Sequence, residues 1–204
     1  MRDKLSRALG QLKQVPKELP AVYCSRTMVC AEDLQMQRPS PLFQRPPSFA
    51  NALVQNIGGG NTMVLNRAAL DLVQDTLPHA NGAISHDWWV YQLVMGAGGH
   101  VIYDPEPSLF YRQHGQNQIG ANDTVWASAK RFKAMLQGQF RNWNTSNIQA
   151  LEAAKHWLTS DAANTLQQFS KARKGNVIRR MIALRKSGVY RQSRRGTFAL
   201  WLAA

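Results

Sequence analysis

The chain is poor in cysteine and has no long hydrophobic run. Its 204 residues include two cysteines, Cys24 and Cys30, whose C-x5-C spacing fits no usual metal site. We interpret both as reduced, partly buried hydrophobic residues without a disulfide. The run at residues 198–204 is far shorter than the roughly 20 residues that span a bilayer. Residues 1–14 are polar and lack the hydrophobic segment of a signal peptide, so we expect a cytoplasmic protein.

Acidic residues are missing from the C-terminal part of the chain. None follows Asp161, and the net charge of the whole sequence is +13. Lysines and arginines recur in this part, at positions 171, 173, 174, 179, 180, 185, 186, 191, 194 and 195. A basic segment favours an anionic partner, either phospholipid head groups or nucleic acid. Nucleic acid is the less favoured partner, because no helix-turn-helix, RRM or zinc signature accompanies the charge.

The periodicity of the hydrophobic residues predicts an α/β part followed by helices. A hydrophobic content of 44% excludes a disordered chain. Strands are expected at 21–24, 27–30, 61–65, 100–104 and 108–111, with a proline-rich loop at 37–47. Helices are expected before Pro16 and at 49–55, 67–75 and 85–96, capped by Ser48, Asn66 and Ser85. Further helices are expected at 125–139, 146–158, 162–174 and 177–186. The boundary near residues 120–124 divides the chain into an α/β part, 1–122, and a helical basic tail, 123–204.

Three stretches of the α/β part carry side chains suited to chemistry on a sugar. Residues 55–62 read Gln-Asn-Ile-Gly-Gly-Gly-Asn-Thr, residues 85–89 read Ser-His-Asp-Trp-Trp, and residues 111–120 read Tyr-Arg-Gln-His-Gly-Gln-Asn-Gln-Ile-Gly. In order and spacing they resemble the C-terminal half of family 2 glycosyltransferases, in the rhamnosyltransferase-like branch. The resemblance covers residues 1–122. It implies an α/β fold with a partial GT-A sheet, which is Rossmann-like and here lacks its nucleotide-binding half.

Asp87 is the candidate catalytic residue. A carboxylate is ionised at neutral pH and can accept the proton of an acceptor hydroxyl. The resemblance implies that Asp87 is the general base of an inverting transferase. The alternative is a structural role at a helix N-terminus, where a negative charge is favourable. The family commonly has an acidic residue before this position, whereas His86 stands here, which changes the acceptor contacts expected of that neighbour.

The two tryptophans after Asp87 cannot both point the same way from a helix. We expect one of Trp88 and Trp89 in the core, and the other is the weaker candidate for stacking on a sugar ring. The resemblance also implies that the glycine-rich loop approaches donor or acceptor closely. The alternative for this loop is a helix end followed by a bend. Its candidate substrate-binding residues are Asn56, Gly59, Gly60, Asn61 and Thr62.

The third stretch supplies candidate contacts for a charged diphosphate. The resemblance implies that His114 helps to hold a divalent cation, Mg²⁺ or Mn²⁺, and a guanidinium at Arg112 suits bidentate phosphate contacts. Asn117 is a candidate for hydrogen bonds to the acceptor or within its loop. A lone histidine at a turn is also common as a purely structural residue, so that alternative stays open for His114.

The donor-binding half of the family is not recognisable in this chain. The family pattern has an Asp-x-Asp segment shortly before a Lys-Leu helix, which Lys4-Leu5 resembles, yet no Asp-x-Asp occurs in the 204 residues. We therefore expect the chain to be a fragment, or to pair with a polypeptide that supplies the other half-sheet. A parallel sheet cut at this point would expose a strand edge.

Together these observations predict an inverting glycosyltransferase that is inactive alone. It would move a sugar from a nucleotide-sugar donor to a saccharide or lipid-linked acceptor in bacterial surface polysaccharide synthesis. The alternative is a non-catalytic interaction or membrane-surface module. For the basic tail, one interpretation is a solvated helical face. The other is docking on anionic lipid at the inner face of the cell membrane, with hydrophobic residues among the arginines: Val177, Ile178, Met181, Ile182, Leu184, Phe198, Leu200 and Trp201.

Overall fold

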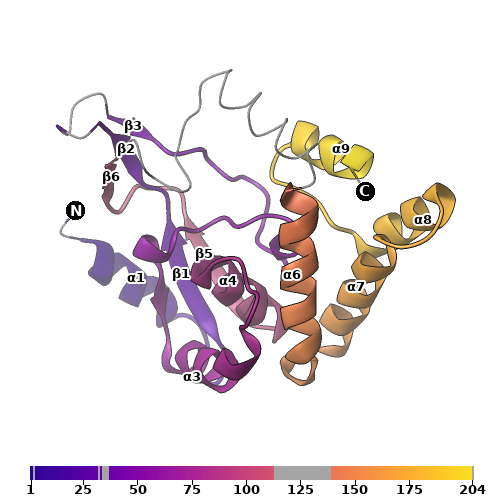
Figure 1. The fold of residues 1–204 in the computed structure, drawn as a ribbon. Coiled ribbons are helices and arrows are strands. Elements are labelled where there is room, and N and C mark those ends of the chain that lie inside the picture. The colour runs from indigo at the N-terminus through magenta and orange to yellow at the C-terminus, as the bar shows by residue number, and fades with distance from the viewer. Residues whose placement is uncertain (2, 32, 34–36, 113–138, 204) are drawn as a thin grey trace.

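A three-stranded mixed sheet lies at the centre of the first half of the chain. The computed structural model describes residues 1, 3–31, 33, 37–112 and 139–203. Strand β1 (Ala21–Ser25) is the middle strand and pairs parallel with β5 (His100–Asp104) and antiparallel with β4 (Val64–Leu65). All five residues of β1 are buried, as expected for a central strand with both faces covered (Figure 1).

A second small sheet continues from the first. It contains β3 (Arg38–Pro39), β2 (Met28–Cys30) and β6 (Phe110–Arg112), with β2 antiparallel to β3 and parallel to β6. The sequence predicted strands at the positions of β1, β2, β5 and β6. Two expectations were wrong. The loop at 37–47 contains the short strand β3. The strand expected at 61–65 is present only as the two-residue β4, and the 3₁₀ turn η1 (Gly60–Thr62) occupies its first two positions.

The helices of this half begin where their caps predict. Helix α1 (Lys4–Leu12) precedes the sheet, and α2 (Phe49–Ala52) begins after Ser48, whose Oγ accepts the Asn51 N–H at 3.1 Å. Helix α3 (Arg67–Thr76) begins after Asn66, whose Oδ1 accepts the Ala69 N–H at 2.9 Å. The 3₁₀ turn η2 (Leu77–His79) and helix α4 (His86–Gly96) follow. Local side-chain capping therefore defines the start of α2 and of α3.

The described part of the tail is helical. It contains α6 (Gln139–Ala153), the 3₁₀ turn η3 (Lys155–Trp157), α7 (Ser160–Lys171), α8 (Val177–Ser187) and α9 (Arg194–Ala203). The predictions at 146–158, 162–174 and 177–186 correspond to α6 with η3, α7 and α8, whereas α9 was not predicted. The helix expected at 125–139 lies outside the described residues except for its last one. Within the described ranges, no helix is both long enough and hydrophobic enough to cross a membrane.

The tail packs on the α/β part through a shared hydrophobic core. Phe49 of α2, Leu53 directly after it and Leu93 of α4 belong to the same buried cluster as Leu151 of α6 and Leu184 of α8. Figure 1 shows α6 standing between the sheet with its helices and α7. The two parts therefore bury their hydrophobic residues together. The boundary predicted between 122 and 123 falls outside the described residues and stays a prediction.

The segment between α8 and α9 also holds the two parts together, by hydrogen bonds. We call Tyr190, Arg191 and Gln192 the clasp. Ser48 Oγ donates to the Tyr190 hydroxyl at 2.9 Å, and Asn51 Nδ2 donates to the Tyr190 carbonyl at 2.9 Å. The Arg191 guanidinium donates to the Val54 carbonyl at 3.0 Å, and the Gln192 N–H donates to Gln55 Oε1 at 2.8 Å. The clasp thus fixes the start of α9 to α2 and the residues that follow it.

An ion pair ties α1 to the sheet. Asp104 Oδ2 accepts hydrogen bonds from the Arg7 guanidinium at 2.7 Å and from the Tyr23 hydroxyl at 2.5 Å. Burial works to raise the pKa of Asp104, but the bonds from Tyr23, from the Glu106 N–H and from Arg7 outweigh it and hold that pKa below its ordinary value. Burial and the bond to Asp104 raise the pKa of Tyr23 to about 12. The cluster is therefore most stable with the carboxyl ionised and the phenol neutral.

Candidate functional site

Two of the three predicted stretches meet in space. The Gly60 N–H donates to Asp87 Oδ2 at 3.1 Å, although 27 positions separate them in the sequence. A Cβ atom placed on Gly60 would lie 2.1 Å from His86 Nε2, closer than any real contact allows. The glycine loop at 58–62 thus lies directly against the first residues of α4. With His86 in this position, a side chain at position 60 would overlap the imidazole, so glycine allows this close approach.

The sheet topology explains this meeting point. Helix α4 precedes β5, which is parallel to β1, so the N-terminus of α4 lies at the carboxyl end of the two parallel strands. In open α/β sheets, ligands bind in the crevice at this end. The N-terminus of a helix also favours negative charge, both on a side chain and on a ligand. His86 is exposed and Asp87 is half-buried, so both side chains reach the surface at this end.

Asp87 has a structural role as well as a candidate chemical one. Its Oδ1 accepts the Trp88 N–H at 2.8 Å, and its Oδ2 accepts the Gly60 N–H. Ser85 holds the N-cap position without a side-chain cap bond, so the predicted Ser85 cap was wrong and Asp87 meets one of the first N–H groups of α4 instead. A carboxylate has about four acceptor sites, and these two bonds leave it the capacity to accept a hydroxyl proton. The two roles predicted as alternatives are therefore compatible.

The glycine loop packs against strand β1 of the central sheet. A Cβ on Gly58 would lie 2.7 Å from Cys24 Cβ, so the loop packs on β1 as closely as its backbone allows. Cys24 and Cys30 carry free thiols and are fully buried, which confirms that they form no disulfide. Burial raises the pKa of the Cys24 thiol to about 12, so this cysteine is unreactive at neutral pH.

Not every residue of the loop faces outward. Thr62 is fully buried and its hydroxyl donates to the Gly59 carbonyl at 2.7 Å, so the substrate contact predicted for Thr62 was wrong. Asn56 Oδ1 accepts the Gly58 N–H at 3.2 Å and shapes the same turn. Gly59 and Asn61 are exposed at the outer edge of the loop. The loop thus offers its backbone at 59–61, while Asn56 and Thr62 fix its conformation.

Lys4 is a component of the site that sequence reasoning did not assign. Its Nζ donates to the Asn61 carbonyl at 2.7 Å and so brings a positive charge from α1 to the glycine loop. The match of Lys4-Leu5 to a family helix was the one signal that could have pointed to it. With Lys4, the meeting point combines an ammonium, a carboxylate and an imidazole. Such a group can bind an anion beside a position that accepts a proton.

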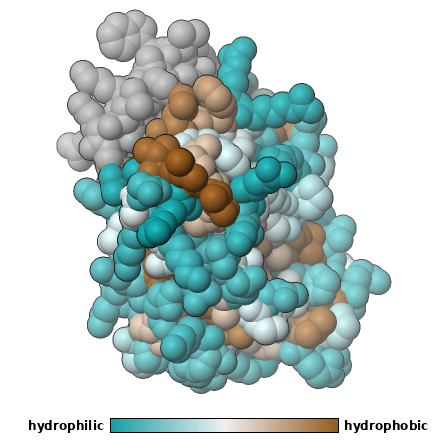
Figure 2. Space-filling model, turned by 90° about the vertical axis from the view of Figure 1, so that its right-hand side faces the viewer, coloured by the Kyte–Doolittle hydropathy of each residue, from teal (hydrophilic) through white to brown (hydrophobic). Residues whose placement is uncertain are grey.

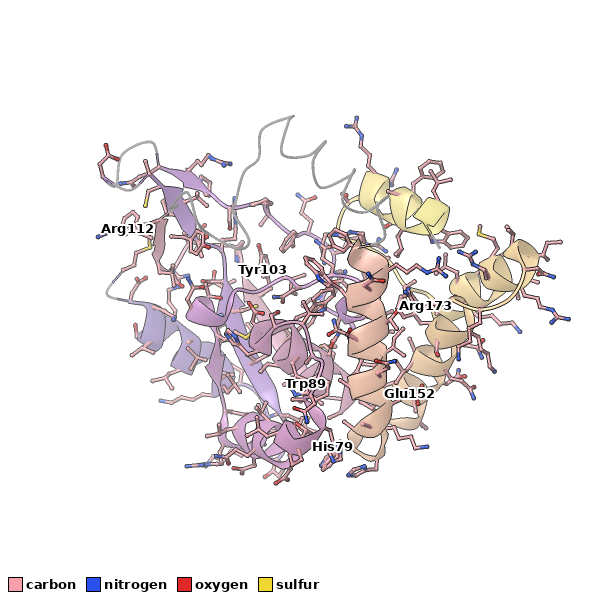
Figure 3. The ribbon with its side chains drawn as sticks, viewed as in Figure 1. His79, Trp89, Tyr103, Arg112, Glu152 and Arg173 are labelled. Atoms are coloured by element: carbon pink, nitrogen blue, oxygen red, sulfur yellow. The ribbon has the colours of Figure 1, made fainter. Side chains whose placement is uncertain are left out.

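Both tryptophans are core residues. Trp88 is 5% exposed and its Nε1 donates to the Ala52 carbonyl at 2.6 Å. Trp89 is 3% exposed and packs in the cluster shared with the tail, where Figure 3 shows it beside α6. The sugar stacking considered for one of them was therefore wrong. The physical reason is that neighbours cover α4 on several sides, so both indoles become buried although they point in different directions.

The third stretch is only partly described. Arg112 is exposed at the end of β6, and Figure 3 shows it at the outer end of the second sheet, well away from Trp89 and α4. His114 and Asn117 lie outside the described residues. Among the residues that are described, no group of three or more His, Cys, Asp or Glu side chains could hold a metal ion. His86 and Asp87 alone do not make the ligand set of a divalent cation.

The comparisons with known proteins point to sugar transfer. The chain is similar to the dTDP-rhamnosyl transferase RfbG of Shigella flexneri, with 30% identity over 93 residues. These residues are 46% of this chain and 29% of that protein, so the match spans less than a third of the relative's length. No family model matches the chain, and no solved structure matches it. The similarity supports a glycosyltransferase-like relationship for a mixed α/β protein.

Proposed function

We propose that this chain forms the acceptor side of an inverting glycosyltransferase of the GT-A type. The observation that carries the proposal is the contact of the Gly60 N–H with Asp87 at the carboxyl end of β1 and β5. It places a half-buried carboxylate against a backbone loop open to solvent, where a sugar hydroxyl can approach. The similarity to a dTDP-rhamnosyl transferase supports a nucleotide-sugar donor, with dTDP-rhamnose as the first donor to test.

In this proposal Asp87 is the general base. It removes the proton of an acceptor hydroxyl as that oxygen attacks the anomeric carbon of the donor sugar. A bond forms from the acceptor oxygen to the anomeric carbon, and the bond from that carbon to the nucleoside diphosphate breaks on the opposite face. The electron pair leaves with the diphosphate, and the configuration at the carbon is inverted.

The neighbours of Asp87 hold the substrates. His86 is exposed beside Gly60 and offers a hydrogen bond to the acceptor. Lys4 lies on the far side of the loop, where an ammonium attracts the negative charge of a diphosphate. The strands and acidic residues that bind the nucleotide would come from sequence beyond the matched 93 residues, in a longer chain or in a partner polypeptide. A divalent cation in the complete enzyme belongs to that part of the proposal.

The test is a transfer assay with the chain supplied with a donor-binding half. Rhamnose transfer from dTDP-rhamnose to a rhamnose-containing saccharide is followed by dTDP release. Asp87→Asn should lower kcat by at least about 100-fold, since a positioned base contributes about that much. The asparagine keeps an oxygen that can accept the Gly60 N–H, so the fold should persist. Asp71→Asn, on the exposed face of α3, is the matched control and should leave kcat unchanged. Wild-type turnover by the Asp87 variant would remove Asp87 from the role of base.

A non-catalytic saccharide-binding module is the second candidate. It is favoured by the short span of the similarity, which covers 29% of the transferase and 46% of this chain. Calorimetric titration of this chain with the acceptor saccharide separates the two candidates. Saccharide binding without sugar transfer, in the assay that includes the donor-binding half, would identify a module. Saccharide binding together with transfer that depends on Asp87 would identify the enzyme. Gly60→Val, which fills the space before His86, should abolish binding in both cases.

A further inference from the structure

The tail exposes a ridge of large hydrophobic side chains. On α8, Val177 is 68% exposed and Ile178 is 72% exposed, and Met181 and Ile182 are exposed beside them. On α9, Phe198 and Leu202 are each 66% exposed. We call these six residues the hydrophobic ridge. Figure 2 views this side of the molecule and shows a hydrophobic patch bordered by hydrophilic side chains. Contiguous exposed hydrophobic side chains of this kind mark an interaction surface.

A hydrophobic groove lies between the α8 and α9 parts of the hydrophobic ridge. It has a volume of about 580 Å³ and lies between α8 and α9, where Val177 and Met181 face Phe198, Trp201 and Leu202. Arg45 and Arg194 also line it. The groove therefore combines a hydrophobic floor with two guanidinium groups. This is the distribution expected where an acyl chain or a glycerol backbone meets a phosphate.

A basic groove lies on the other side of α8. Its volume is about 500 Å³, and its lining from α7, α8 and the turn between them includes Lys171, Lys174, Arg179 and Lys186 without any acidic side chain. Ile182 of the hydrophobic ridge also lines it. One helix thus presents hydrophobic side chains between a hydrophobic groove and a cluster of four cations.

The positive charge of this region has few acidic neighbours in the sequence. No acidic residue follows Asp161, whereas the ion pairs of Arg7 with Asp3 and Asp104 and of Arg67 with Asp71 lie in the α/β part. Burial, together with the nearby charges of Arg141 and Arg180, lowers the pKa of Arg173 to about 10. Like charges therefore crowd one another on the tail, and an anionic surface would relieve their repulsion.

We propose that α8 and α9 dock the chain on an anionic phospholipid bilayer, with the hydrophobic ridge inserted at the level of the head groups. Helix α8 has 11 residues, so it lies in the plane of the interface and does not cross it. Nucleic acid would complement the cations but not isoleucine and phenylalanine side chains. A second protein chain would cover the ridge but would have to supply several carboxylates. An anionic bilayer complements both the hydrophobic ridge and the cations beside it. This inference does not depend on the proposed transfer reaction.

The test measures co-sedimentation of the full chain with vesicles. Vesicles of phosphatidylcholine mixed with phosphatidylglycerol should bind the chain, and vesicles of phosphatidylcholine alone should bind it far more weakly. The double variant Arg179→Gln/Lys186→Gln should weaken binding about 25-fold, since each charge near an anionic leaflet contributes about fivefold. The matched control Lys13→Gln/Lys17→Gln removes two exposed cations at the other end of the chain and should bind as the wild type does.

A second pair of variants tests the hydrophobic contribution at constant charge. Ile178→Ser/Ile182→Ser should reduce vesicle binding more than tenfold with an unchanged circular dichroism spectrum, because both side chains are exposed and add little to the core. Leu77→Ser, exposed on η2, is the control. Vesicle binding by Ile178→Ser/Ile182→Ser that equals the binding of the wild type would overturn the proposal. So would displacement of the chain from vesicles by duplex DNA, or dimerisation that the same isoleucine variants abolish.

Discussion

Helices α4 and α8 have the same length, 11 residues, and both are rich in large hydrophobic side chains, yet they use them in opposite ways. Trp88 and Trp89 of α4 are almost completely buried, whereas Val177 and Ile178 of α8 are largely exposed. The difference comes from their neighbours. Helix α4 lies among β1, β5, α2 and α3, whereas α8 packs mainly on α7 and exposes four of its large hydrophobic side chains (Figure 1). Hydrophobic content alone therefore does not tell which helix builds the core.

The comparison also separates the charges of the two regions. Around the sheet, acidic and basic side chains pair, as Asp104 does with Arg7. On the tail, cations accumulate with no carboxylate after Asp161. Paired charges near the sheet stabilise the fold, while an excess of one sign attracts a partner of the opposite sign. The following predictions test this division, beginning with the largest expected effect.

Trp88→Ala should destabilise the fold by about 3–5 kcal/mol, because it leaves a cavity under α4. Ile178→Ala on α8 should change the free energy of unfolding by no more than about 0.5 kcal/mol, as a surface substitution does. Urea denaturation followed by circular dichroism measures both. Equal effects of the two substitutions would show that α8 is as buried as α4 and would break the comparison.

Asp104→Asn should destabilise the fold by about 1.5–3 kcal/mol, because it removes charged hydrogen bonds to Arg7 and Tyr23. The pKa of Asp104 is lower in the folded chain than its ordinary 3.8, so its contribution is complete above that pH and disappears as the pH falls through the folded value. For Tyr23 the sign is opposite: its contribution is complete below pH 10.0 and disappears as the pH rises through about 12.

Thermal denaturation across this pH range checks the prediction for Asp104. The Asn variant should lose part of the acid sensitivity of the wild type. Asp71→Asn, whose carboxylate pairs with Arg67 on the exposed face of α3, is the control and should cost no more than about 1 kcal/mol. If the melting temperatures of the wild type and of Asp104→Asn fall equally as the pH is lowered, the ion pair of Asp104 does not control acid stability.

Gly58→Ala should destabilise the fold by about 1–3 kcal/mol, because the new methyl group would overlap Cys24 in the centre of β1. The substitution acts at the base of the candidate site, so it should lower saccharide binding together with stability. Chemical denaturation and calorimetric titration measure the two effects. A variant of unchanged stability would mean that the loop lies further from β1 than this structure shows.

Gly10→Ala should have the smallest effect and the opposite sign. Gly10 is inside α1, nothing lies within 4 Å of its added methyl group, and alanine favours the helix by about 0.5–1 kcal/mol. The melting temperature should therefore rise by a few degrees. The two substitutions, Gly10→Ala and Gly58→Ala, distinguish a glycine that is not needed for close packing from one that is. A lower melting temperature for Gly10→Ala would contradict the prediction.

Local signals in the sequence predicted much of the fold. Ser48 and Asn66 mark helix starts because their caps depend on residues three positions away. Strand β1 was recognisable because a fully buried strand is a continuous hydrophobic run. By contrast, Thr62 was assigned to a strand and to a substrate, since its hydrogen bond to the Gly59 carbonyl forms only once the glycine loop has folded on β1.

The candidate site was predicted in part. The glycine loop and Asp87 stood out as unusual stretches, but their contact is a consequence of sheet topology and not of either stretch. The bond from Lys4 to Asn61 joins residues 57 positions apart, and no periodicity reports such a pair. Burial of both Trp88 and Trp89 depends on helices of the tail and on α2, which a helical wheel of α4 by itself does not contain.

The clasp at Tyr190, Arg191 and Gln192 has a mechanical consequence. It joins α9 to α2, and the Ala52 carbonyl of α2 holds the Trp88 indole one residue beyond Asp87. A linkage of hydrogen bonds therefore runs from the segment before α9, through α2, to the helix that carries Asp87. In a chain bound to a bilayer, such a linkage would keep the Asp87 carboxylate at a fixed distance from the membrane surface. Acceptors would then be selected by the distance of their hydroxyl from the membrane.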